Sequence, residues 1–269
     1  MKTAIIIPAR YGSTRFPGKP LALINGRSML SRVYTKGLQA AAGDKNIAVM
    51  IATDDDRIAA HAKEIDARCV MTDADCATGS DRVLQAAENS GENFDFLISL
   101  QGDAPFTPAS VLLALITTIR DNPHLEVVTP VHRLNWNDLD ALRDAKQTTP
   151  FSGTTCIRHA DGRALWFSKN IIPAIREENK LRGQSPLSPV WQHMGVYGYR
   201  VDILRRFVKW PQTPYEKLEG LEQLRFLENE IAIQTVEVSG AHGPLQSGID
   251  SPEDLARAEA HIKNFGDDL

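Results

Sequence analysis

The feature of this sequence that most restricts its fold is a basic, glycine-containing segment placed directly after a short apolar run. The run A-I-I-I at 4–7 predicts a buried strand, which ends at Pro8 because proline has no amide hydrogen for a ladder hydrogen bond. The next twelve residues contain two glycines and three cations, namely Arg10, Arg15 and Lys19. Glycines let backbone N–H groups approach an anion, and the cations bring charge and donors to phosphate oxygens. With a helix predicted from Ser28, we favour a phosphate site over a solvated basic turn.

This segment matches neither of the two commonest phosphate motifs. A Walker loop has a fixed spacing before Gly-Lys and then a serine or threonine, whereas five residues separate Gly12 from Gly18 and Pro20 follows Lys19. The chain also lacks G-x-G-x-x-G, so nothing supports a dinucleotide fold. The segment therefore predicts a different kind of phosphate loop.

Strand and helix patterns alternate along the first half of the chain. Apolar runs predict strands at 47–52, 67–71, 94–100 and 126–131. Amphipathic patterns predict helices at 28–42, from 53, at 80–88 and at 107–120, the last opened by Thr107 as N-cap and Pro108 as first helical residue. This alternation predicts an α/β fold, a mostly parallel Rossmann-like sheet with helices on both faces, whose ligands bind beyond the carboxyl ends of the strands.

The pattern changes after about residue 132. The stretch 135–150 is polar and predicts a surface excursion, 152–167 predicts an antiparallel hairpin turning at Asp161-Gly162, and 175–189 predicts a mobile loop. Further patterns predict strands at 191–199 and 231–236 and helices at 201–208, at 216–229 and from 251. We therefore expect one domain over 1–269, with a smaller antiparallel lobe inserted at roughly 135–215.

Composition limits the class of partner and compartment. The net charge is −4 and no long basic run occurs, so we expect neither nucleic acid nor an anionic membrane as the main partner. No apolar run approaches the roughly 18 residues of a spanning helix, and the first residues do not form a signal peptide. Three cysteines without a C-x-x-C spacing indicate reduced thiols, so we expect a cytoplasmic protein without a disulfide frame or zinc site.

Two acids occupy positions suited to a metal ion beside a phosphate. Asp103 follows an apolar strand at its carboxyl end, and Asp250 directly precedes the last capped helix. Mg²⁺ binds proteins through one or two carboxylates together with phosphate oxygens. On the residues alone, an Asx turn and a helix-start acid are the simpler interpretations of the two positions.

Ordered motifs over nearly the whole length resemble one family. The strings P-A-R-Y-G-S-T-R at 8–15 and P-G-K-P at 17–20 resemble the signature loop of sugar nucleotidyltransferases, and in detail that of the 3-deoxy-manno-octulosonate cytidylyltransferases, or CMP-Kdo synthetases. Q-G-D at 101–103 and G-I-D-S-P-E-D-L at 248–255 resemble the family's Q-G-D and its closing motif. Other similar motifs lie at 78–82, 164–169, 193–200 and 219–225.

The resemblance implies a Mg²⁺-dependent reaction that joins CTP to an acidic eight-carbon sugar, giving the CMP-sugar and pyrophosphate for lipopolysaccharide biosynthesis. It implies a homodimer, with sugar binding and dimerisation in the 135–215 lobe. It gives catalytic roles to Arg10, Lys19 and Asp103, and metal ligation to Asp103 and Asp250. The implied nucleotide-binding residues are Ala9, Arg10, Ser13, Thr14, Arg15, Lys19, Thr78, Gly79, Ser80, Arg82 and Gln101. The implied sugar-binding residues are Gln101, Lys169, His193, Tyr197, Glu222 and Gln223.

Three departures from the family pattern lie on the sugar side. Ala104 replaces a glutamate after Q-G-D, the segment 153–157 lacks the family's strand lysine, and Lys169 replaces an arginine. A missing lysine would suit a sugar that carries its own ammonium, so we hypothesise that the substrate is either 3-deoxy-manno-octulosonate or its 8-amino form. The alternatives are a CMP-neuraminic-acid-type or other sugar nucleotidyltransferase and, least favoured, a nucleotide-binding module without turnover.

Several of these residues also have ordinary structural interpretations. The 78–82 segment is a helix N-cap with a solvated Asp–Arg pair in most proteins that contain such a string. His193 alone is more often a core histidine whose hydrogen bonds are satisfied, Tyr197 can simply pack in a strand, and Glu222 with Gln223 can form a solvated helical turn. Only the resemblance favours binding roles for them.

Overall fold

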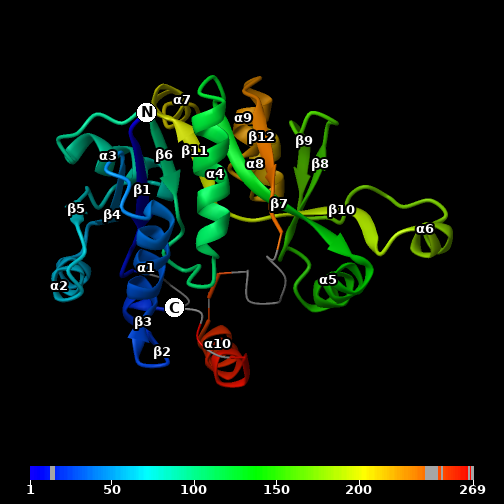
Figure 1. The fold of residues 1–269 in the computed structure, drawn as a ribbon, viewed down its shortest axis with the longest axis horizontal. Coiled ribbons are helices and arrows are strands. Elements are labelled where there is room, and N and C mark those ends of the chain that lie inside the picture. The colour runs from blue at the N-terminus through cyan, green and yellow to red at the C-terminus, as the bar shows by residue number, and fades with distance from the viewer. Residues whose placement is uncertain (13–15, 240–247, 250, 266, 268–269) are drawn as a thin grey trace.

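A mixed sheet runs through the centre of the molecule (Figure 1). The computed structural model describes residues 1–12, 16–239, 248–249, 251–265 and 267. Within them, ten strands follow the order β5-β4-β1-β6-β11-β7-β10-β8-β9, with β12 paired to β7. The strands are β1 (Thr3–Pro8), β4 (Ile47–Thr53), β5 (Cys69–Met71), β6 (Phe96–Ser99), β7 (Val127–Asn135), β8 (Thr154–Arg158), β9 (Ala164–Ser168), β10 (Leu187–His193), β11 (Tyr197–Arg200) and β12 (Ile233–Glu237). A small hairpin of β2 (Leu23–Ile24) and β3 (Arg27–Ser28) forms a second sheet.

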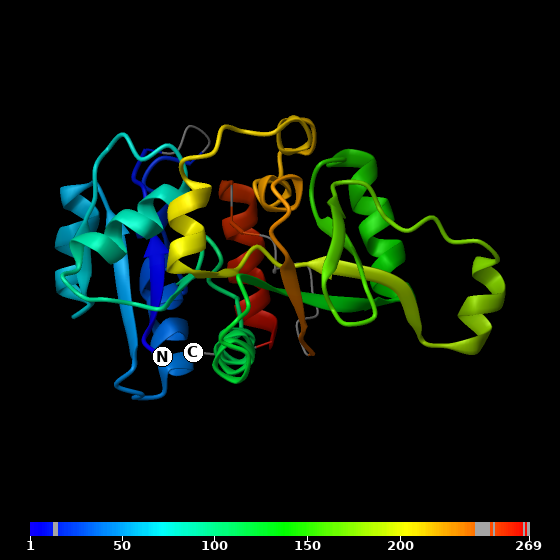
Figure 2. The same cartoon turned by 90° about the horizontal axis from the view of Figure 1, so that it is seen from above.

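Helices cover both faces of this sheet, as the alternating pattern predicts. They are α1 (Met29–Ala41), α2 (Asp56–Glu64), α3 (Gly79–Asn89), α4 (Ala109–Asp121), α5 (Trp136–Thr148), α6 (Glu178–Gln184), α7 (Val201–Phe207), α8 (Pro214–Glu219), α9 (Leu224–Glu228) and α10 (Pro252–Phe265), with a 3₁₀ turn η1 (Lys19–Leu21). In Figure 2, α3 and α7 lie over one face of the strands, and α1 and α4 over the other. The α/β class is confirmed.

Strand β1 explains how one short apolar run supports two cores. It pairs in parallel with β4 on one side and β6 on the other, so it lies between neighbours and has no exposed edge. Ile5 and Ile7 pack into the cluster under α1 and α4, whereas Ala4 and Ile6 pack into the cluster under α3 and α7. Because side chains alternate across a strand, an A-I-I-I run serves both faces at once.

The inserted lobe continues the main sheet. β7 extends from the parallel half into the lobe and pairs antiparallel with both β11 and β10, and β8 and β9 follow as the predicted hairpin. Three expectations for this region are wrong. The stretch 135–150 is mostly helix α5, capped by Asn135 whose side chain accepts from Asp138 N at 2.8 Å. The stretch 175–189 contains helix α6 and the start of β10, and 191–199 is divided between β10 and β11.

Two helices begin later than predicted. The helix expected from 53 begins at Asp56, because Thr53 still belongs to β4 and Asp55 is the N-cap. Ser28 caps α1, accepting from Ser31 N at 3.1 Å. Pro108, and not Thr107, is the N-cap of α4, which begins one residue later than predicted. The helix predicted from 216 to 229 is two short ones, α8 and α9, because Gly220 ends α8 in the left-handed region at φ 62°.

Helix α10 and hairpin β2–β3 lie at the same edge of the molecule, which is also the carboxyl edge of β1 (Figure 1). Here a small apolar cluster joins distant segments: Ile24, Met29, Ile249, Ala258 and Ile262 are buried, with Phe16, Phe106 and Leu255 packed against them. We call this the α10 cluster. Within the part of the chain that the structure describes, no helix is long and apolar enough to cross a bilayer.

Candidate active site

The loop after β1 folds back on itself through one glycine. Gly18 N donates to Tyr11 O at 2.9 Å, and Gly18 has φ 72°, a left-handed conformation in which a side chain would be strained. The Tyr11 ring lies under the guanidinium of Arg57, 3.3 Å from ring centroid to Cζ. This closure places Lys19 at the start of η1, directed toward the sheet edge. Ser13, Thr14 and Arg15, three of the predicted nucleotide-binding residues, lie outside the described residues.

Lys19 and Asp103 meet at this edge. Lys19 Nζ lies 2.7 Å from Asp103 Oδ2, with 13% and 33% of the two side chains exposed. Asp103 reaches this place because Gly102 passes close to β1: a Cβ on Gly102 would lie only 2.7 Å from Pro8 O. The glycine of the Q-G-D string is therefore needed for the close approach of two strand ends.

The segment before α10 reaches the same carboxylate. Ile249 N donates to Asp103 O at 2.8 Å, and a Cβ on Gly248 would lie 3.2 Å from Asp103 Oδ1. Asp250, the second predicted metal ligand, lies outside the described residues, but its two predecessors in the sequence contact Asp103. The α10 cluster holds these segments together, since it contains Phe16, Phe106 and Ile249.

Arg10 connects the first loop to the start of α3. Its Nη2 donates to Cys76 O and, at 3.3 Å, to Thr78 O. Ala9, next to it, is buried and donates its N–H to Ala52 O at 2.9 Å, which anchors the loop to β4. In this structure the Arg10 guanidinium therefore holds the 76–78 backbone, a role that sequence reasoning did not include.

The 78–82 segment begins α3 with a complete capping box. Asp81 N donates to Thr78 Oγ1 at 3.2 Å, and Thr78 N donates to Asp81 Oδ2 at 2.8 Å. Gly79 lies against Pro8, which brings this helix start to the end of β1. The Thr78 side chain therefore acts as the N-cap of α3, which is the ordinary structural interpretation of this segment.

The side chains of Ser80 and Arg82 make their contacts outside this capping box. Ser80 Oγ donates to Glu222 Oε2 at 2.9 Å and so connects α3 to the α8–α9 turn. Arg82 is fully buried, with Nη1 on Thr72 Oγ1 at 2.5 Å and 3.1 Å from Asp54 Oδ1. Its Nε and Nη2 make no hydrogen bond within the described residues.

The predicted sugar-binding residues gather on the antiparallel side of the site. His193 ends β10, Tyr197 begins β11, and their ring centroids lie 5.3 Å apart. His193 Nε2 lies 2.8 Å from Thr129 Oγ1. Burial, and then the nearby charge of Lys169, lower the pKa of His193 to about 3, so the imidazole is neutral near pH 7. Burial also raises the pKa of Tyr197 well above its usual value, which keeps the phenol protonated.

Glu222 and Gln223 each present a buried polar atom without a hydrogen-bond partner in the part of the chain that the structure describes, although Arg225 Nη2 lies 3.9 Å from Glu222 Oε1 as an ion pair. Glu222 Oε1 and Gln223 Nε2 make no hydrogen bond within the described residues. Burial raises the pKa of Glu222, since a charged carboxylate is disfavoured away from water. Buried polar groups normally make hydrogen bonds, so an acceptor and a donor without hydrogen bonds on adjacent residues indicate a place where a ligand can supply them.

Lys169 and Gln101 are the remaining two predicted sugar-binding residues. Lys169 N donates to Glu219 Oε2 at 2.8 Å, and Glu219 Oε1 also accepts from Ser168 Oγ at 2.8 Å. Burial lowers the pKa of the Lys169 ammonium. Gln101 Nε2 lies 3.4 Å from Ser99 Oγ at the end of β6. Sequence reasoning missed Glu219, although it begins the E-x-L-E-Q-L-R string that includes Glu222.

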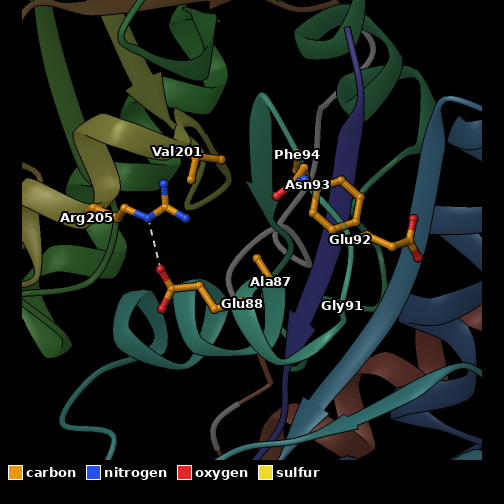
Figure 3. Close-up of a pocket in the computed structure, with 8 residues that line it drawn as sticks. All are labelled: Ala87, Glu88, Gly91, Glu92, Asn93, Phe94, Val201 and Arg205. Carbon is orange, nitrogen blue, oxygen red and sulfur yellow. Dashed lines mark hydrogen bonds and ion pairs between the residues drawn. The ribbon is translucent and has the colours of Figure 1, made fainter.

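Two pockets differ in what they offer a ligand. One of about 470 Å³ opens beside Glu222 and is lined also by Thr78, Gln212, Glu216, Lys217 and Gly220. The other, of about 400 Å³, lies between the end of α3, the start of β6 and α7 (Figure 3). Its Glu88 and Arg205 pair with each other at 2.9 Å, so their charges cancel. The second pocket lies at the amino edge of the parallel strands, away from Asp103.

Metal-binding donors are few in the described residues, where no group of three or more histidine, cysteine, aspartate or glutamate side chains converges. Asp103 offers carboxylate oxygens at the carboxyl edge, with Oδ1 on the side of Gly248. Oxygen donors of this kind suit a hard cation such as Mg²⁺, which takes one or two carboxylates and completes its shell with phosphate and water. The Asp103 site therefore fits that ion.

Comparison with known proteins is consistent over the whole chain. A family model described as cytidylyltransferase matches residues 4–233. The 3-deoxy-manno-octulosonate cytidylyltransferase of Maricaulis maris is 39% identical over 99% of this chain and 99% of its own. The enzyme of the same name from Syntrophotalea carbinolica is 38% identical over 98% of this chain and 100% of its own.

Solved structures agree with the sequence relatives. The structure of CMP:2-keto-3-deoxy-manno-octonic acid synthetase complexed with CTP superposes with a TM-score of 0.83 and 33% identity, covering 98% of this chain and 99% of that one. A cytidylyltransferase structure from Leptospira borgpetersenii shares the fold at a TM-score of 0.61 and 17% identity, covering 98% of this chain and 88% of that one.

Proposed function

The chain belongs to the 3-deoxy-manno-octulosonate cytidylyltransferase family, and from that membership we propose that it joins CTP to 3-deoxy-manno-octulosonate or its 8-amino form. The enzyme is a nucleotidyltransferase. Its products are the CMP-sugar, a donor for lipopolysaccharide biosynthesis, and pyrophosphate. The observation that carries this proposal is the meeting of Lys19, Asp103 and the 248–249 segment at the carboxyl edge of the sheet.

On the nucleotide side, the described cations are arranged for a polyphosphate. Lys19 supplies a positive charge beside Asp103, and the hydrogen bond from Gly18 N to Tyr11 O closes the loop that carries it. Arg10 holds the 76–78 segment, so the start of α3 is fixed next to the first loop. We propose that CTP lies along this loop, with its phosphates toward Lys19 and its base toward the start of α3.

We propose Asp103 and Asp250 as the ligands of Mg²⁺. The support from the structure is that Oδ1 of Asp103 lies beside Gly248, where an added Cβ would make a tight contact of 3.2 Å with that oxygen. When bound, the ion polarises the α-phosphate and lowers the pKa of the attacking hydroxyl. The protein's own contribution is to hold these groups in place, which is where most of the acceleration arises in phosphoryl transfer.

On the sugar side, we propose that Glu222 and Gln223 bind hydroxyl groups. Glu222 Oε1 and Gln223 Nε2 are buried and make no hydrogen bond in the described residues, and sugar hydroxyls both donate and accept. We propose that the ammonium of Lys169, which lies near His193, binds the carboxylate of the acidic sugar. The anomeric 2-hydroxyl then attacks the α-phosphorus in line, and pyrophosphate leaves.

A substrate panel tests this function. Pyrophosphate release is measured with CTP, UTP and ATP against 3-deoxy-manno-octulosonate, its 8-amino form and N-acetylneuraminate, with product analysis by mass spectrometry. Turnover with CTP and an octulosonate supports the proposal, and the ratio of the two octulosonates identifies the C8 substituent. Turnover only with neuraminate or UTP, or nucleotide binding without pyrophosphate release, would contradict it.

We also propose a cytoplasmic homodimer. Cys69, Cys76 and Cys156 are all free, which fits a reducing compartment. Light scattering coupled to size-exclusion chromatography measures the oligomeric state directly, and a mass near that of one chain, 29.7 kDa, would contradict the dimer.

A further inference from the structure

Lys146, which sequence reasoning did not single out, places its ammonium among four backbone carbonyls. It extends from the last turn of α5 and donates to Gly153 O at 3.0 Å, to Pro150 O at 3.3 Å and to Ser152 O. It also donates to Lys169 O at 2.5 Å. An ammonium has three hydrogens, so these oxygens use its whole donor capacity and it has none left for a substrate.

The two ends joined by Lys146 are the open end of the β8–β9 hairpin. Gly153 directly precedes β8 and Lys169 directly follows β9. Gly153 has φ 65°, and a Cβ on it would lie 2.8 Å from Leu142 Cδ1, so the loop before β8 is tightly placed against α5. Lys146 therefore closes the hairpin at the end where Lys169 leaves it.

Lys169 is held from the opposite side as well. Its N–H donates to Glu219 Oε2 at 2.8 Å, while its C=O accepts from Lys146. Both backbone polar groups of Lys169 are thus fixed by charged side chains from two helices, α5 and α8. Its own ammonium makes no hydrogen bond or ion pair within the described residues, and it lies close enough to His193 to act on that ring's pKa. A fixed backbone with an unpaired, half-buried ammonium is suited to receive an anion.

We propose that Lys146 is a positioning residue that acts through Lys169, holding the Lys169 ammonium where the carboxylate of the acidic sugar binds. This inference rests on the proposed function. Lys146 does not touch the sugar. Its effect is on sugar binding, and the nucleotide side, which is formed by other segments, does not depend on it.

The test is a double-mutant cycle on steady-state kinetics with the full-length protein. Lys146→Met, Lys169→Met and the double variant are compared with wild type for the KM of the octulosonate, the KM of CTP and kcat. Lys146→Met is expected to raise the KM of the sugar about tenfold and to leave the KM of CTP within about twofold. Added to Lys169→Met, it is expected to raise the sugar KM less than twofold further, because the group through which it acts is already absent.

Two further variants distinguish a positioning role of Lys146 from a general loss of structure in the lobe. Lys146→Arg retains donors to the carbonyls and is expected to recover part of the sugar KM. Lys180→Met, which removes an exposed lysine of α6 in the same lobe, is the matched control and is expected to match wild type. If Lys146→Met does not fold, Lys146→Gln, which keeps two N–H donors, is measured in the same cycle.

The outcomes are distinct. An unchanged sugar KM in Lys146→Met, an equal rise in the KM of both substrates, or effects of the two methionine variants that multiply would each overturn the role of Lys146. A wild-type chain that neither turns over nor binds an octulosonate by calorimetry would instead overturn the proposed function, and the inference with it.

Discussion

The ammonium of Lys19 lies 2.7 Å from the carboxylate of Asp103, although 84 positions separate the two residues. Lys19 follows the first strand and Asp103 follows β6, and these strands are parallel neighbours, so their carboxyl ends meet at one edge of the sheet. This pair is the centre of the proposed site.

Asp103→Asn is expected to lower kcat at least ~10²-fold, or about 2.7 kcal/mol of barrier. The amide keeps the shape of the side chain but loses the charge that the proposed metal ion requires. Asp144→Asn, at an exposed position on α5, is the control for loss of one negative charge and is expected to match wild type. A kcat for Asp103→Asn within threefold of wild type would remove Asp103 from the metal site.

Gly102→Ala is expected to reduce both activity and stability, because the added Cβ would lie 2.7 Å from Pro8 O and must push the Asp103 loop away from β1. We expect a loss of about 1–3 kcal/mol in the free energy of unfolding, as for other overpacked positions. Gly183→Ala is the control: Gly183 lies in α6, and a Cβ there meets nothing within 4 Å. Chemical denaturation of both variants measures the difference, and equal midpoints would refute the proposed need for glycine.

Ile262→Ala is expected to weaken the α10 cluster, which holds Phe16, Phe106 and Ile249 around the site. Removal of a buried isoleucine side chain costs about 2–5 kcal/mol of stability. Ile119→Ala, in the core under α4, is the matched cavity variant. If the cluster positions the site loops, kcat falls further for Ile262→Ala than for Ile119→Ala at equal loss of stability. Equal kcat values would show that α10 only stabilises the fold.

The stability of the protein is expected to fall on acidification through His193. Its pKa is lowered from 6.5 to about 3 in the folded protein, so below pH 6.5 the unfolded chain binds a proton that the folded chain does not. The stabilisation that comes from keeping the His193 imidazole neutral is therefore fully present above pH 6.5 and decreases as the pH falls toward 3. His193→Asn is expected to show a shallower decrease, by about one proton, in denaturation midpoints measured across this range. Parallel curves for the two proteins would contradict the lowered pKa.

The parallel half of the fold was predictable because its signals are local. A-I-I-I before Pro8 and the Ser28 cap each depend on a few neighbouring residues, and each forms as expected. The helix expected from 53 also forms, although it begins at Asp56. Helix α5 was missed because only Trp136 and Leu139 are buried on it, which leaves little apolar periodicity to detect. Its one visible signal was Asn135 followed three residues later by Asp138, a cap pattern.

The candidate site was predictable as a set of motifs, and the contacts between their members were not. Nothing in the local pattern around Ser80 indicates that its hydroxyl meets Glu222, 142 positions away. Arg82 stands in a recognisable string, yet the fold buries it beside Asp54. Lys146 has no motif at all, and its role appears only when α5 packs beside the hairpin that ends at Lys169.

The sequence by itself determined the α/β class, the strand before the first glycine-containing loop, the Q-G-D turn and the family, because these depend on residue types at short, ordered spacings. Only the tertiary structure decided which side chains share a site and which support it. Those choices depend on packing between segments far apart in the chain, such as Gly248 against Asp103 and Gly102 against Pro8. At Gly102 the absence of a Cβ lets the Asp103 turn approach the end of β1.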